Sequence, residues 1–265
     1  MMQFTEILYD KKDGAARITI NRPEKYNACT PATIYELTLA FTDAWVDRSV
    51  GVVVLTGAGE KAFCTGGDQS IREPGGYAGT VAALPLEVGW QQVSALIRTI
   101  PKPVIARVNG YAIGGGHVFH VVCDFSIASD KATFGQAGPR VGSFDPGFGT
   151  GDLVRAVGIK KAKEIWFLCR KYSAGEALKM GLVNAVVPHD QLDAEVDKWC
   201  AEILAKSPTA LKMLKYAFHA ETDGVFGITN LGVGGLSLFY DTEESLEGRN
   251  AFIEKRPPEF SKFRK

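Results

Sequence analysis

Two glycine-rich turns contain the residues of this chain whose types and spacing point to chemistry. Gly110 to His117 holds three consecutive glycines and follows the apolar run Pro103 to Val108, which is typical of a buried strand. Phe63 to Asp68 is a second glycine turn after an apolar run. Glycine has no Cβ, so its backbone N–H can approach a ligand closely, and N–H groups at a helix N-terminus are unpaired. Two such turns would each donate one N–H to the same negative oxygen. When one turn is considered alone, the alternative to binding an anion is a tight turn that allows close packing of a helix on a strand.

Acid–base candidates lie elsewhere in the chain. Ser143 and Asp145 place a hydroxyl and a carboxylate two residues apart on a loop or helix start. N-capping is the alternative, because Ser and Asp are favoured caps and Pro146 suits the first helical position. Tyr240 is a further candidate, with a core aromatic as its alternative role. Tyr77, on a glycine-rich stretch, is a weaker candidate and is assigned to substrate binding.

Composition excludes several classes of protein. The chain has 265 residues with 30 basic and 30 acidic side chains, and this zero net charge argues against a nucleic-acid or membrane surface built on bulk electrostatics. No apolar run is long enough to span a membrane, and residues 1–10 show no signal-peptide pattern. The five cysteines are scattered without CxxC spacing, so we expect no zinc site or disulfide framework, and a reducing cytoplasm as the compartment.

Strands and helices alternate along the first two-thirds of the chain. β-branched runs between turn residues predict strands, and helical spacing of apolar residues predicts helices at 31–47 and 160–171. Alternation of this kind is typical of an α/β fold with parallel strand pairing. The predicted strands are 16–20, 51–56, 103–108, 125–128 and 183–187.

The final part of the chain is predicted to be helical, at 190–205, 208–220, 224–240 and 242–255. These segments are rich in apolar residues and have no strand partner. They would pack on a core of their own, on the α/β part or on another subunit. The stretch from Ser70 to Gly89 is instead rich in glycine and proline, and we expect a mobile loop there.

Two common motifs do not apply. Gly57 to Ala62 matches the spacing of the dinucleotide fingerprint, but a second glycine turn follows where a helix would have to begin. Ser143 is not in a nucleophile elbow, because Val141 and Asp145 occupy its glycine positions. His117 and His120 are interpreted as packing or capping residues.

Three motifs together resemble the crotonase (enoyl-CoA hydratase/isomerase) superfamily: Asn21 to Ala28, Phe63 to Asp68 and Gly110 to His117. The resemblance covers essentially the whole chain. It implies an α/β spiral core of ββα units over residues 1–189 and a helical trimerisation region over 190–265. It further implies an acyl-CoA substrate, no covalently bound cofactor, no metal, and a homotrimer or homohexamer. The oxyanion donors would be Gly67 and Gly115.

Two branches of that superfamily match more closely. Dihydroxynaphthoyl-CoA synthase is resembled by residues 135–145, 164–170 and 247–252. The 2-ketocyclohexanecarboxyl-CoA hydrolase is resembled by residues 68–70, 79–81, 84–87, 145–147 and 187–196. In the hydratases, the resemblance implies two water-binding glutamates at the positions of Val118 and Gly138. Because neither carboxylate is present, simple hydration of an enoyl thioester is disfavoured.

Basic residues near turns and chain ends are candidates for binding coenzyme A. Arg22, Lys25 and Lys255 would pair with its phosphates, although each alone is equally a solvated charge. Ala28 belongs to the first motif of the resemblance and is assigned to substrate binding with them.

The preferred prediction is hydrolytic ring opening of a cyclic β-keto acyl-CoA, with Asp145 as base and Ser143 and Tyr240 orienting water or protonating carbon. The rival is intramolecular Claisen closure to dihydroxynaphthoyl-CoA. In synthases with glycine at the place of Gly138, the resemblance implies that a bound bicarbonate is the base. Because this chain has Gly138, a bicarbonate site near that residue is a further expectation. A non-catalytic acyl-CoA binder would need no acid or base, and the Ser143–Asp145 pair argues against it.

Overall fold

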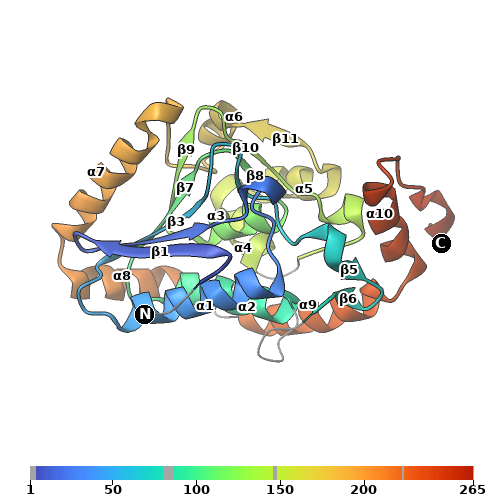
Figure 1. The fold of residues 1–265 in the computed structure, drawn as a ribbon, viewed down its shortest axis with the longest axis horizontal. Helices are drawn as coiled ribbons and strands as arrows, with labels where there is room; N and C mark the ends of the chain where they lie inside the picture. Colours follow the sequence, from blue (N-terminus) through green and yellow to red (C-terminus); the bar gives the residue numbers. More distant parts are fainter. Residues whose placement is uncertain (1–3, 80–85, 146–147, 223, 265) are drawn as a thin grey trace.

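A six-stranded sheet forms the centre of the molecule in the computed structural model, which describes residues 4–79, 86–145, 148–222 and 224–264 (Figure 1). β1 pairs antiparallel with β2, and all other neighbouring strands are parallel. The order is β1 (Ile7–Lys12), β2 (Ala15–Ile20), β3 (Val52–Gly57), β7 (Val104–Val108), β9 (Phe125–Ser129) and β12 (Ala185–Val187). The five predicted strands and their parallel pairing are confirmed. β1 was missed, since most of its residues are polar and exposed.

A second sheet of three-residue strands brings the two glycine turns together. Its order is β11 (Lys171–Ser173), β10 (Thr133–Gly135), β8 (Tyr111–Ile113) and β4 (Ala62–Cys64). β4 and β8 pair in parallel, so the turns that follow them emerge at the same edge of the sheet. Strands this short show no readable alternation, which is why the sequence did not predict them.

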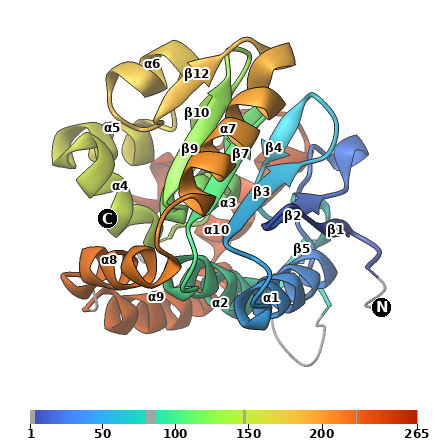
Figure 2. The same ribbon diagram turned by 90° about the vertical axis from the view of Figure 1, so that its left-hand side faces the viewer.

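Helices cover both faces of the large sheet. α1 (Pro31–Val46) begins at a capping box in which the Thr30 hydroxyl accepts from the N–H of Thr33. α7 (Leu192–Leu204) crosses the face opposite α1 and α2 (Figure 2) and places Leu192, Val196 and Cys200 in an apolar core with β3, β7 and β9. The other helices are α2 (Leu86–Thr99), α3 (Gly115–Val122), α4 (Phe148–Val157), α5 (Ile159–Leu168), α6 (Ala174–Lys179), α8 (Pro208–Ala220), α9 (Val225–Tyr240) and α10 (Glu243–Ile253).

The predicted loop at Ser70 to Gly89 is wrong for the residues that the structure describes. Residues 69–71 form a short 3-10 helix, β5 (Arg72–Glu73) and β6 (Gly76–Tyr77) form a hairpin, and α2 already begins at Leu86. Residues 80–85 lie outside the described part of the chain, and so does Pro146, the predicted helix start. The described part of that helix, α4, begins at Phe148.

Candidate active site

The two predicted oxyanion donors line one cavity of about 100 Å³. Gly66 and Gly114, which precede them, have φ values of +89° and +58°. Residues that have a Cβ rarely adopt this backbone conformation. Gly115 is the first residue of α3, so its N–H has no partner within the helix. A Cβ built on Gly66 would lie 3.0 Å from the Gly115 nitrogen. The two turns therefore meet directly at the cavity wall.

A parallel bridge fixes the direction of the Gly67 N–H. The Cys29 N–H donates to the Gly66 carbonyl at 2.8 Å, and the Asp68 N–H donates to the Cys29 carbonyl at 2.9 Å. In such a bridge the intervening residue turns its own N–H and C=O to the opposite side. The Gly67 N–H is thus directed away from Cys29.

Each of the two predicted oxyanion donors, Gly67 and Gly115, is covered by one aromatic side chain. The ring of Tyr77 lies so close to Gly67 that a Cβ there would be 2.6 Å from its hydroxyl oxygen. A Cβ on Gly115 would be 2.3 Å from the indole of Trp90, which stacks on Phe119 with ring centroids 4.3 Å apart. Both glycines are therefore required by the aromatic walls of the cavity.

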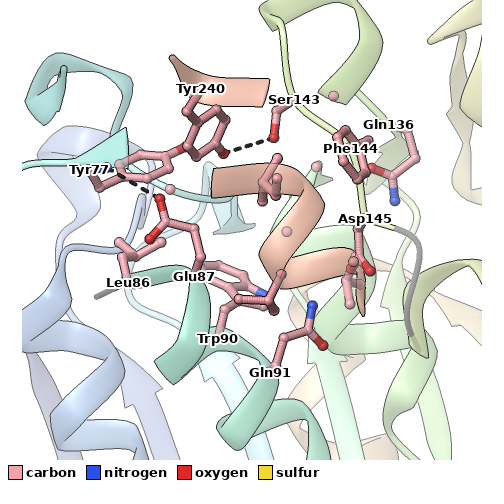
Figure 3. Close-up of a pocket in the computed structure, with 18 of the residues that line it drawn as sticks. Tyr77, Leu86, Glu87, Trp90, Gln91, Gln136, Ser143, Phe144, Asp145 and Tyr240 are labelled. Carbon is pink, nitrogen blue, oxygen red and sulfur yellow. Dashed lines mark hydrogen bonds between the residues drawn. The ribbon is translucent and has the colours of Figure 1, made fainter. Parts of the chain in front are cut away.

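Ser143, Asp145 and Tyr240, the predicted acid–base residues, all line the same cavity (Figure 3). The hydroxyls of Ser143 and Tyr240 are hydrogen-bonded at 3.0 Å. Tyr240 is 3% exposed, and this burial raises the pKa of its phenol, which the nearby Arg72 guanidinium partly offsets. A neutral phenol at physiological pH is a proton donor.

Arg72 was not predicted from the sequence, yet it contacts both Tyr240 and the backbone that precedes Ser143. Its guanidinium is 1% exposed and lies 4.2 Å from the centroid of the Tyr240 ring. It also donates to the carbonyls of Val141 and Gly142 at 2.5 and 2.6 Å, directly before Ser143. An isolated arginine after a 3-10 turn gives no sequence signal for these contacts.

Asp145 lies beside Val118, one of the two positions at which the resemblance implies a water-binding glutamate in hydratases. A Cβ on Gly149 would meet Oδ2 of Asp145 at 2.8 Å and a methyl group of Val118 at 2.6 Å. Val118 and Gly138 both line the cavity. The two positions that lack glutamate therefore face the same space as the Asp145 carboxylate.

Glu87 is a second carboxylate in the cavity wall that sequence reasoning did not select. It lies in the first turn of α2, and Trp90 and Gln91 follow it at helical spacing on the same wall. Its Oε1 accepts the backbone N–H of Tyr77 at 3.3 Å. The i, i+3, i+4 spacing of Glu87, Trp90 and Gln91 could have indicated that they share one face of a helix. It was overlooked because a loop was expected in this stretch.

Two polar groups lie near Gly138, where the bicarbonate site was expected. Gln136 and Trp166 line the cavity with Gly138. The Trp166 Nε1 is buried without a hydrogen-bond partner, and the Gln136 amide nitrogen lies 3.2 Å from Nδ1 of His117. A Cβ on Gly138 would meet the Ser143 carbonyl at 2.9 Å, so this position is held to glycine.

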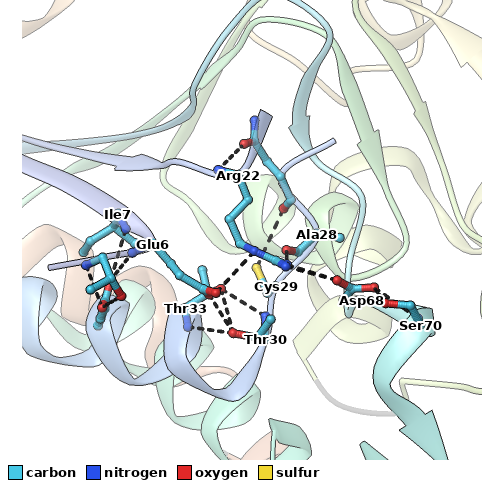
Figure 4. A network of polar contacts seen from close by, with 12 residues as sticks. Glu6, Ile7, Arg22, Ala28, Cys29, Thr30, Thr33, Asp68 and Ser70 are labelled. Carbon is cyan, nitrogen blue, oxygen red and sulfur yellow. Dashed lines mark hydrogen bonds and ion pairs between the residues drawn. The ribbon is translucent and has the colours of Figure 1, made fainter. Parts of the chain in front are cut away.

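The residues assigned to coenzyme A lie outside this cavity. The Arg22 guanidinium pairs with Glu6 at 3.3 Å and with Asp68 at 3.2 Å, and it also donates to the Ala28 carbonyl (Figure 4). Arg22 thereby connects Ala28 to the residue after Gly67. Lys25 and Lys255 are exposed, the first in a 3-10 turn and the second just after α10. Their roles toward the phosphates stay predictions.

The remaining polar candidates are structural. His117 and His120 are buried with ring centroids 4.8 Å apart, and burial lowers the pKa of both imidazoles, to about 3 for His117. They pack in the core, as predicted. Within the described ranges, no group of His, Cys, Asp and Glu side chains is arranged to hold a metal ion. None of the helices described there is long and apolar enough to cross a membrane.

Known proteins match the chain along nearly its whole length. The profile of the enoyl-CoA hydratase/isomerase family matches residues 10–263. An enoyl-CoA hydratase from Mycobacterium avium subsp. paratuberculosis K-10 is similar at 30% identity and a TM-score of 0.85, covering 95% of this chain and 100% of its own. A methylmalonyl-CoA decarboxylase in complex with 2-nitronate-propionyl-CoA is similar at 26% identity and a TM-score of 0.84, and the match covers 97% of this chain and 99% of the decarboxylase chain.

Proposed function

This chain belongs to the enoyl-CoA hydratase/isomerase family of acyl-CoA-processing enzymes, and we propose that it opens the ring of a cyclic β-keto acyl-CoA by hydrolysis. A substrate of the 2-ketocyclohexanecarboxyl-CoA type has the required ketone next to the carbon that bears the thioester. The coenzyme A moiety is part of the substrate. Arg22, Lys25, Ala28 and Lys255 stay our candidates for contacts with it.

The reaction proceeds by addition of water and cleavage of one carbon–carbon bond. Asp145 accepts a proton as a water oxygen bonds to the ring ketone carbon. The tetrahedral adduct collapses, and the bond from that carbon to the thioester α-carbon breaks. The bonding electrons form a thioester enolate, whose oxygen is stabilised by the N–H groups of Gly67 and Gly115. Tyr240, held by Ser143, protonates the α-carbon and leaves an open-chain thioester with a distal carboxylate.

The arrangement of Asp145 and the Ser143–Tyr240 pair in one cavity with both oxyanion glycines carries this proposal. A base and a proton donor are both present, whereas the positions of the hydratase glutamates hold Val118 and Gly138. This set suits cleavage through an enolate better than addition of water to a double bond. A protein that only bound acyl-CoA would require none of these three side chains.

Intramolecular Claisen closure to dihydroxynaphthoyl-CoA is the second candidate, and the corner around Gly138 favours it. The unpartnered Trp166 Nε1 and the Gln136 amide are neutral donors that fit a bicarbonate ion. Bound there, bicarbonate would supply a base for removal of the α-proton. Gln136 and Trp166 would hold it.

Supplying one ring-opening and one ring-closing substrate side by side tests the proposal. A cyclic 2-ketocyclohexanecarboxyl thioester should lose its enolate absorbance and yield an open-chain dicarboxylic monothioester. Formation of naphthoyl-CoA from the succinylbenzoyl thioester, dependent on added bicarbonate, would assign the chain to the synthase branch instead. Binding of both thioesters without turnover of either would leave only the non-catalytic binder.

A further inference from the structure

The cavity that receives the acyl group contains two carboxylates and no cation among its described lining residues. Glu87 and Asp145 line it, whereas no lysine, arginine or histidine does. The undescribed stretches 80–85 and 146–147 contain no such residue in the sequence either, nor does 225–231 in α9. Two acidic side chains therefore carry the formal charges among the described lining residues.

Arg72 does not neutralise this wall from within the cavity. Its guanidinium lies behind the ring of Tyr240 and is 1% exposed. Its N–H groups are directed to the carbonyls of Val141 and Gly142 and to the Ser245 hydroxyl. It is therefore held behind the wall, where it makes no contact with an acyl group in the cavity, although its positive charge opposes that of Glu87 at the phenols of Tyr77 and Tyr240.

Glu87 and Asp145 approach the cavity from different elements. Glu87 extends from α2 toward the β6 hairpin, where its Oε1 also lies 2.8 Å from a Cβ built on Gly76. Asp145 comes from the loop before α4, on the other side of Trp90 and Gln91 in Figure 3. An acyl group between them is exposed to negative charge from both directions.

We propose that Glu87, together with Asp145, makes this cavity select uncharged acyl groups and disfavour acyl groups with a distal carboxylate. The proposal deepens the proposed function, because ring opening creates such a carboxylate from a neutral ketone inside the cavity. Like charges within several Å repel strongly where water is scarce. The neutral ring is accepted, and the carboxylate product is released rather than retained. The same charges oppose entry of the succinylbenzoyl thioester, whose free carboxylate is on the aromatic ring.

Calorimetric titration of two matched ligands tests the selection without any turnover. Heptanoyl-CoA and 6-carboxyhexanoyl-CoA have the same chain length and differ only in the terminal carboxylate. The wild-type protein should bind the neutral thioester about tenfold more tightly, as expected for unscreened charges at this range. Glu87→Gln keeps an oxygen for the Tyr77 N–H but removes the charge, so this ratio should shrink several-fold. Glu87→Asp retains the charge, so it should retain most of the difference in affinity between the two ligands.

Glu73→Gln is the matched control, because Glu73 is exposed on the neighbouring strand of the hairpin and does not line the cavity. It should leave the ratio unchanged. Equal binding of the two ligands by the wild-type protein, or an unchanged ratio in folded Glu87→Gln, would overturn the selection. The titration measures only binding, so its result stays valid even if the separate assay shows no ring opening. Likewise, loss of the selectivity would not contradict ring opening.

Discussion

The Ser143 Oγ and the Tyr240 Oη lie 3.0 Å apart although 97 residues separate them in the chain. Ser143 follows a 3-10 turn (Gly138–Val141), and Tyr240 is the last residue of α9. Arg72 contacts α9 through the Tyr240 ring, and it contacts the segment before Ser143 through the Gly142 carbonyl. The proposed acid–base pair therefore depends on the position of a C-terminal helix, α9.

Tyr240→Phe removes the proposed proton donor and keeps the ring that covers Arg72. Ring opening should slow by a factor of about 10²–10⁴, the usual contribution of a general acid, with little change in thioester binding. Steady-state rates and calorimetric binding measure the two effects. Tyr216→Phe, on the exposed face of α8, is the control. Equal rates in the Tyr240 and Tyr216 variants would exclude Tyr240 as the donor.

Removal of the Gly115 N–H tests the oxyanion donors. A Cβ at this position collides with Trp90, so the substitutions are made in a Trp90→Leu background. Gly115→Pro eliminates the N–H and should lower turnover by about 10²–10³, whereas Gly115→Ala keeps it and should retain most activity. Circular dichroism confirms folding. Similar turnover in the two folded variants would remove Gly115 from the mechanism.

The sequence predicted the long strands, and the family match confirms the superfamily resemblance. The two glycine turns and the candidates Ser143, Asp145 and Tyr240 line one cavity, while their catalytic roles stay predictions. The sequence did not predict the short strands β4, β8 and β10, because they are stabilised by pairing across the chain rather than by a local pattern. Arg72 was missed for the same reason, because its role arises from contacts with Gly142 and Tyr240 that no local spacing encodes. Glu87 was missed because a loop was expected where α2 begins.

Acid should destabilise the fold partly through His117. Burial lowers the pKa of this imidazole to about 3, below the ordinary value of about 6.5 that it regains on unfolding. Between these values the unfolded chain binds the extra proton, so stability falls as pH falls through this window. One such group contributes about 2 kcal/mol of loss between pH 7 and pH 5. Urea unfolding should show a smaller acid-induced loss for His117→Gln. An identical loss would contradict this account.

Assembly into a trimer or a dimer of trimers is expected from the apolar surface of the C-terminal helices. Phe218 on α8, Leu238 on α9 and Phe252 on α10 are 76%, 75% and 53% exposed in the single chain. Large apolar side chains of this kind favour burial against another copy. Light scattering at micromolar concentration should give three or six chains, and Leu238→Arg should reduce this number. A monomeric wild-type protein would contradict the expectation.

Asp145 as the base for attack of water on the ring ketone is the central claim, and isotope labelling tests it most directly. In ¹⁸O water the wild-type protein should place label in the new distal carboxylate and leave the thioester intact. Asp145→Asn should bind the thioester but open no ring, while Asp190→Asn, at an exposed position, behaves as wild type. Label found only in free acid, together with released coenzyme A, would show thioester hydrolysis and contradict the proposed reaction.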